Sequence, residues 1–68
     1  MELVMTDAEN RVAEAISIAA EYGWIDGDHH KTWTIDQMIR ALTGDQYDEF
    51  VEEICDGDPD NWDIGIAP

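Results

Sequence analysis

The excess of acidic side chains constrains this chain more than any other feature of its sequence. The 68 residues carry 17 Asp and Glu against three Lys and Arg, which gives a formal net charge of -14 at pH 7. A compact chain of this length has a radius of gyration of roughly 11 Å, so its charges lie close together and their repulsion opposes folding. We therefore expect the negative field to meet a basic partner. A salt-rich host or simple solubility are the alternative explanations.

The length allows a single domain, residues 1–68, with a small core. Cys55 is the only cysteine, so no internal disulfide can form, which favours a reducing compartment over secretion. No apolar run approaches the length of a membrane span, and the N-terminus lacks the basic start of a signal peptide. A hydrophobic fraction of 44% argues against disorder. The sequence predicts a folded, soluble protein of the cytoplasm.

Three helices are predicted, over residues 7–22, 28–43 and 45–55. Thr6 and Glu9 have the spacing of a capping box, and glycines at 23 and 44 are typical helix ends. Asp28 and Asp45 are the predicted N-caps of the second and third helices. Apolar residues recur at helical spacing on one side of each helix: Ala8, Val12, Ala15, Ile16 and Ala19; then Ile35, Met38, Ile39 and Leu42; then Tyr47, Phe50, Val51 and Ile54.

The remaining residues, 56–68, are predicted to form an extended tail. Trp62, Ile64 and Ile66 stand at alternate positions, which is typical of an extended segment that lies against the helices. The predicted fold is all-α: a small three-helix bundle with the C-terminal tail docked on it.

The third helix and the tail concentrate the negative charge, because the stretch from Asp45 to Asp63 holds nine acids and no base. Carboxylates one helical turn apart are separated by roughly 6 Å along the axis, comparable to successive phosphates of a nucleic-acid strand. Such a row can present the charge pattern of DNA to a nucleic-acid-binding protein. The predicted partner-binding residues are Asp45, Asp48, Glu49, Glu52, Glu53, Asp56, Asp58, Asp60 and Asp63. A solvated acidic face without a partner is the alternative.

Direct binding of nucleic acid, metal binding and catalysis all find little support. Three basic residues cannot neutralise a phosphate backbone. The run from Asp56 to Asp60 begins like a calcium loop, but Asn61 stands where the turn glycine belongs. His29 and His30 point about 100° apart on a helix and make no ligand pair. We predict no metal and no cofactor.

No catalytic residue is predicted either. The chain has no nucleophile–base set and no phosphate-cradling glycine loop, and the acids around Cys55 disfavour its thiolate. Trp33 lies outside the apolar stripe of its helix, so it either packs on the tail or anchors an interface. Ile18, on the polar side of the first helix, is a second possible contact point. Arg40 is predicted to pair with Asp36, four residues before it.

The block IDGDHHKTWTIDQMIRALTG, residues 25–44, resembles a segment of a family of small proteins from tailed phages and prophages. The opening MTDAENRVAEAI and the closing WDIGIAP are also similar to that family, so the resemblance covers most of the chain. The family's stretch before the final tryptophan is longer than the CDGDPDNWD found here. The family has no known function, so the resemblance implies a phage origin and carries over no functional residue.

Small, very acidic phage proteins are similar in character to anti-CRISPR and anti-restriction inhibitors. The first hypothesis is therefore an inhibitory DNA mimic that occludes the DNA-binding groove of a host effector complex in the infected bacterium. The alternative is a phage accessory protein that binds another host protein through an apolar patch around Trp33 or Ile18. A metal-responsive module is a weaker third hypothesis. The expected state is a monomer or a weak homodimer.

Overall fold

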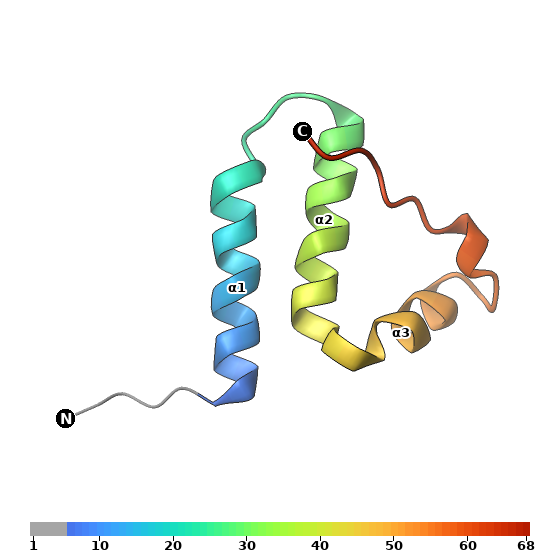
Figure 1. The fold of residues 1–68 in the computed structure, drawn as a ribbon. Coiled ribbons are helices and arrows are strands. Elements are labelled where there is room, and N and C mark those ends of the chain that lie inside the picture. Colours follow the sequence, from blue (N-terminus) through green and yellow to red (C-terminus); the bar gives the residue numbers. More distant parts are fainter. Residues whose placement is uncertain (1–5) are drawn as a thin grey trace.

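The computed structural model describes residues 6–68, which form helices joined by turns and irregular chain (Figure 1). The elements in order are helix α1 (Asp7–Tyr22), helix α2 (Asp28–Thr43), a 3-10 turn at Gly44–Gln46, helix α3 (Tyr47–Ile54) and a 3-10 turn at Pro59–Asn61. Residues 6–68 contain no strand, so the predicted all-α class is confirmed. The predicted spans of the first two helices are confirmed as well.

Helix α1 begins with the predicted capping box. The Thr6 hydroxyl accepts a hydrogen bond from the Glu9 amide, and the Glu9 carboxylate accepts one from the Thr6 amide, both at 3.2 Å. These two bonds satisfy amides that have no partner within the helix. The local sequence pattern therefore fixes the start of α1 directly.

The predicted N-caps of the other two helices are wrong. Asp28 is the first residue of α2, and the capping position is Gly27, whose φ of 116° suits glycine. Asp45 lies in the 3-10 turn, so Gln46 precedes α3, and neither helix has a side-chain cap bond. The tighter turn after Gly44 shortens the third helix to eight residues.

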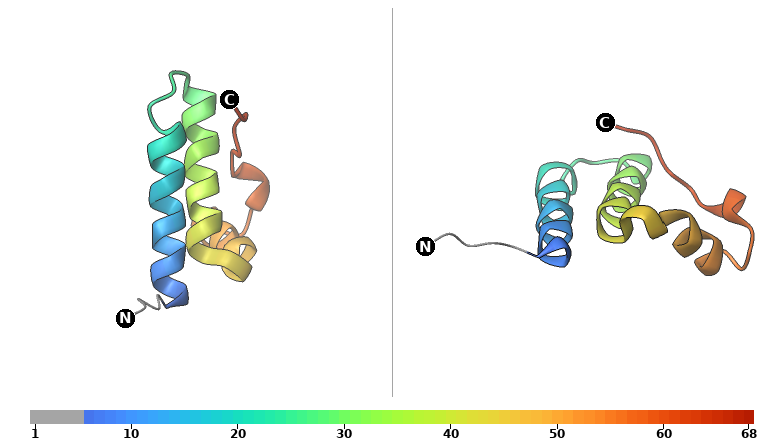
Figure 2. Two further views of the ribbon diagram at one scale, coloured as in Figure 1. Left: turned by 60° about the vertical axis from the view of Figure 1, so that its left-hand side comes forward. Right: turned by 60° about the horizontal axis from the view of Figure 1, so that its bottom comes forward.

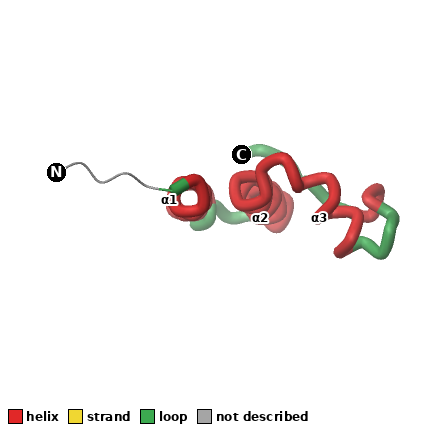
Figure 3. The backbone as a smooth tube through the Cα atoms, turned by 90° about the horizontal axis from the view of Figure 1, so that it is seen from below, coloured by secondary structure: helices red, strands yellow, loops and turns green. Residues whose placement is uncertain are grey.

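The helices lie in a single row with α2 in the middle (Figure 2). Helix α1 packs beside α2 (Figure 3), whereas α3 contacts α2 at the end of the hairpin away from its connecting loop (Figure 1). Within the described chain α1 and α3 make no contact, so the predicted three-helix bundle with a shared core is not confirmed. The Cα atoms span 46 × 30 × 12 Å, and the shortest extent is about one helix diameter.

A row of helices buries much less apolar surface than a three-helix bundle does. Among the described apolar residues only Ala15 and Val51 are fully buried. Four residues of the apolar stripes of α1 and α2 are largely exposed, with exposed fractions of 49% for Val12, 62% for Ile16, 54% for Ile35 and 44% for Leu42. The prediction of these four as core residues is wrong for the isolated chain, because no third helix covers the hairpin formed by α1 and α2. On α3, Phe50 and Ile54 are predicted to point inward, but they are 36% and 47% exposed.

Candidate binding surface

The position of the acidic C-terminal half depends on one buried carboxylate. Asp36, in the middle of α2, is 0% exposed. It accepts hydrogen bonds from Arg40 Nε at 2.7 Å, from Trp62 Nε1 at 2.7 Å and from the Tyr47 hydroxyl, with a longer one from Gln37 Nε2 at 3.4 Å. Helix α2, helix α3 and the tail each contribute a donor. Asp36 therefore ties these three segments together.

The donors keep this carboxylate ionised despite its burial. Burial by itself raises the pKa of Asp36, but hydrogen bonds from Trp62, Tyr47 and Arg40 outweigh it, and the pKa lies below the usual 3.8. Its hydrogen bond to Arg40 raises the pKa of that guanidinium, which also lies over the Tyr47 ring, 4.1 Å from its centroid. Burial and the bond to Asp36 raise the pKa of Tyr47. The predicted Arg40–Asp36 pair is confirmed.

The end of the tail docks on the first turn of α2, beside the loop that joins α1 and α2 (Figure 1). The Ile66 amide donates to the His29 carbonyl at 3.0 Å, and the His30 imidazole Nδ1 lies 2.9 Å from the Ile66 carbonyl. A carbonyl can only accept, so Nδ1 carries the proton. His29 through its backbone carbonyl and His30 through its ring thus hold the tail. Their sequence positions argue against a metal-ligand pair, and no local pattern predicts this contact with the tail.

The apolar patch predicted around Trp33 and Ile18 is partly covered. The Trp33 ring meets the Tyr22 ring of α1 edge to face, with centroids 5.0 Å apart, and Trp33 is half-buried. Ile18 is also half-buried. The backbone of Trp33, rather than its ring, comes closest to the tail at Gly65. The Trp33 ring thus serves the packing of α2 on α1, and its backbone faces the tail.

All nine predicted partner-binding acids are exposed, and the structure places them in three groups. Asp45 and Asp48 line a hollow that they share with Arg40 and Tyr47. Their charge is therefore partly balanced by a nearby guanidinium.

The second group consists of Glu49, Glu52 and Glu53, which surround a shallow hollow beside Gly57. No basic residue lines this hollow. The three glutamates lie within five consecutive residues of α3, so their carboxylates are close neighbours on one helix. We call them the glutamate cluster.

The third group follows α3. Asp58 accepts a hydrogen bond from the Asn61 side chain at 3.2 Å, and Asp63 accepts one from the Gly65 amide at 2.9 Å, so both also shape the local chain. Asp56 has a positive φ of 53° just after the helix, and Asp60 lies in the second 3-10 turn. These four acids extend the negative surface from α3 into the tail.

Helix α3 by itself presents only a short row of carboxylates. With eight residues, α3 is about 12 Å long, so the helix covers the length of two or three phosphates of one strand. Within residues 6–68 the Arg40–Asp36 contact is the one ion pair, which leaves all nine acids without a direct basic partner.

The described part of the chain gives no sign of a metal centre or a membrane span. Residues 6–68 hold no group of three His, Cys, Asp or Glu side chains arranged to bind a metal ion. Over the same residues, no helix combines the length and the apolar character that crossing a bilayer requires. Cys55 is a half-buried free thiol at the end of α3.

Comparison with known proteins adds no relative. No protein-family model, curated protein or solved structure matches this chain.

Proposed function

We propose that this chain is a phage-encoded inhibitory binding protein that mimics DNA. Its acidic surface would occupy the DNA-binding groove of a host defence complex, such as a CRISPR effector, in the cytoplasm of the infected bacterium. The observation that carries this proposal is the set of nine exposed, unpaired acids on α3 and the tail. The resemblance to small phage proteins supports the biological setting.

The glutamate cluster forms the centre of the proposed contact. The hollow that its three carboxylates surround has no basic residue, although Glu52 also borders a second hollow with Arg40, and Asp45 and Asp48 share a hollow with Arg40 as well. Lysines and arginines of a DNA-binding groove would therefore gain most from Glu49, Glu52 and Glu53. The other six acids extend the field that steers the encounter.

The hydrogen bonds of the buried Asp36 support the proposal because they hold the acidic segments in place. A mimic needs its charges at fixed positions, because a mobile acidic segment loses conformational entropy on binding. The hydrogen bonds of Asp36 to Tyr47 and Trp62 attach both α3 and the tail to α2. In this proposal the docked tail is part of the binding surface.

Charge reversal tests the proposal. An effector complex is first captured from a DNase-treated host lysate on immobilised wild-type protein. The wild type should then compete with duplex DNA for this complex, and the triple variant Glu49→Lys, Glu52→Lys, Glu53→Lys should not. Wild-type binding should weaken roughly tenfold or more between about 0.05 M and about 0.5 M salt, because screening removes the attraction. Competition is read from the effector's DNA-binding isotherm.

A matched variant separates position from total charge. Glu14→Lys, Glu21→Lys, Asp26→Lys changes the net charge equally, at exposed positions on α1 and the α1–α2 loop. It should leave most of the competition intact. Equal losses from both triple variants, or competition that survives reversal of the glutamate cluster, would show the proposal to be wrong.

A further inference from the structure

The exposed apolar residues of α1 and α2 lie on one side of the hairpin. A groove between the helices is lined by Ala19, Gly23, Lys31, Thr34, Ile35 and Met38. Ile16 and Val12 continue from Ala19 along α1 at three- and four-residue steps, and Leu42 continues from Met38 along α2. The four large exposed side chains therefore flank the same groove. We call Val12, Ile16, Ile35, Met38 and Leu42 the hairpin face.

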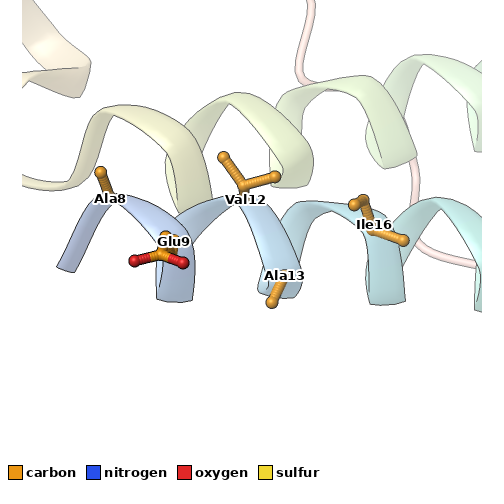
Figure 4. A pocket seen from close by; sticks show the side chains of 5 residues that line it. All are labelled: Ala8, Glu9, Val12, Ala13 and Ile16. Carbon is orange, nitrogen blue, oxygen red and sulfur yellow. The ribbon is translucent and has the colours of Figure 1, made fainter. Parts of the chain in front are cut away.

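Figure 4 shows the α1 part of this face. Ala8, Glu9, Val12, Ala13 and Ile16 line a shallow surface along the first turns of the helix. Val12 points toward α2 and Ala13 points away from it, so small and branched apolar side chains occupy a wide arc of α1. Nothing within residues 6–68 covers this arc, because α3 lies beyond α2.

The hairpin face differs from the rest of the molecule in its charge. In a chain with 17 acids, the one acid along this side of α1 is Glu9, at the edge, where its carboxylate is held by Thr6. Glu14 and Glu21 lie on the other side of α1 by helical spacing. The groove also contains Lys31, one of the three basic residues. On α2, the exposed Asp28 lies in the first turn, seven residues before Ile35 and on the same side of the helix. This side is therefore mainly apolar, with Glu9 near one end and Asp28 near the other.

The charge distribution decides what kind of partner fits here. A basic protein is attracted to the acids of α3 and the tail, and it gains no electrostatic energy at the hairpin face. A second copy of this chain is repelled by the acidic surfaces. It can approach closely only through a side that carries few acids, and the hairpin face, with Glu9 and Asp28 near its two ends, is such a side.

The arrangement of the helices in a single layer also favours a second copy of this chain as the partner. Domains are built from at least two packed layers of secondary structure, and chains this small often gain a sufficient core by oligomerisation. Two 16-residue helices present a face about 24 Å by 20 Å. The projected area of this face is about 480 Å², which is below the roughly 800 Å² per partner of a standard interface and in the range of a weak one.

We propose that a second copy of this chain packs on the hairpin face, giving a homodimer with two layers of helices. Isologous packing buries Val12, Ile16, Ile35, Met38 and Leu42 of both copies and leaves the glutamate cluster at the outer end of each. The dimer does not rest on the proposed DNA mimicry. It accounts for the exposure of four residues that the sequence pattern assigns to a core.

Analytical ultracentrifugation tests the dimer on the full chain. Over about 1 to 300 µM protein the mass should rise from 7.7 kDa toward twice that value. Dimerisation should strengthen with added salt, because screening reduces repulsion between like-charged copies. Ile16→Asp should raise the dissociation constant about 30-fold or more. Ser17→Asp adds the same charge on the side of Glu14 and Glu21 and should change it little.

Several results would overturn the dimer. A mass that stays at 7.7 kDa across the concentration series in high salt excludes it. Equal weakening by Ile16→Asp and Ser17→Asp excludes this face. If circular dichroism shows Ile16→Asp to be unfolded, the wild-type urea midpoint still decides, since it must rise with protein concentration for a dimer. A concentration-independent midpoint rejects the proposal. If the wild type is monomeric and Ile16→Asp abolishes inhibition of the effector, the hairpin face binds another protein and not a second copy.

Discussion

Asp36 is the residue on which the arrangement of the C-terminal half depends. It is fully buried, and its partners Tyr47 and Trp62 belong to segments that no local rule brings to α2. A buried carboxylate is costly unless its oxygens are hydrogen-bonded. Here three strong donors satisfy it, so the carboxylate selects one position for α3 and one for the tail.

Replacing Asp36 by Asn should therefore destabilise the fold. An amide presents its NH2 group to donors that need an acceptor, and we expect the free energy of unfolding to fall by about 2–3 kcal/mol. Urea unfolding monitored by tryptophan fluorescence measures the loss. Asp26→Asn makes the same chemical change at an exposed loop position and should cost little. Equal stability of the two variants would contradict the role given to Asp36.

The effect of this substitution should depend on pH. The folded-state pKa of Asp36 lies below its ordinary value, so its stabilising effect is fully present above an unfolded-state pKa of about 3.9. That effect is lost as the pH falls through the lower folded-state pKa. The stability difference between wild type and Asp36→Asn should thus be constant near neutral pH and shrink below about pH 4.

At the scale of elements, the tail is held on α2 by a close backbone approach at Gly65. Its φ is 76°, and an added Cβ would overlap the His29 carbonyl oxygen and the Trp33 amide nitrogen. Gly65→Ala should lower the free energy of unfolding by more than the roughly 1–2 kcal/mol of the backbone conformation alone. It should also speed hydrogen exchange of the Ile66 amide, which donates to His29.

Gly57 provides the control for Gly65. Its φ is 83°, but nothing lies within 4 Å of an added Cβ. Gly57→Ala should cost only the conformational part and leave the Ile66 amide protected. If the two alanine variants behave alike, tail docking does not depend on the close approach at Gly65.

At the scale of the whole molecule, the net charge of -14 opposes folding and is relieved by one ion pair within residues 6–68. Salt should therefore stabilise the protein. Between about 0.05 M and about 1 M NaCl, we expect the free energy of unfolding to rise by about 1 kcal/mol or more. The less negative variant Glu14→Lys, Glu21→Lys, Asp26→Lys should show a smaller rise. A salt-independent urea midpoint at fixed protein concentration would contradict this expectation.

Local features were predictable from the sequence. The capping box at Thr6 and the spans of α1 and α2 are confirmed, because cap bonds and helical periodicity involve residues three or four positions apart. The Arg40–Asp36 pair is confirmed for the same reason. The exposure of the nine acids also follows from their high cost of burial. The N-caps predicted at Asp28 and Asp45 are wrong, because a glycine occupies the capping position of α2 and Asp45 lies in a 3-10 turn before α3.

Contacts between residues that are far apart in the sequence were decided by the tertiary structure. Tyr47 and Trp62 reach Asp36 across 11 and 26 residues, and the two histidines hold Ile66 across more than 30. Periodicity shows which side of a helix is apolar, but it does not show which side of which neighbour will cover it. The sequence alone thus determined the helices and the negative charge. Only long-range packing around Asp36 decided that the helices form a row, with nine of the acids on α3 and the segments beside it and an apolar side uncovered.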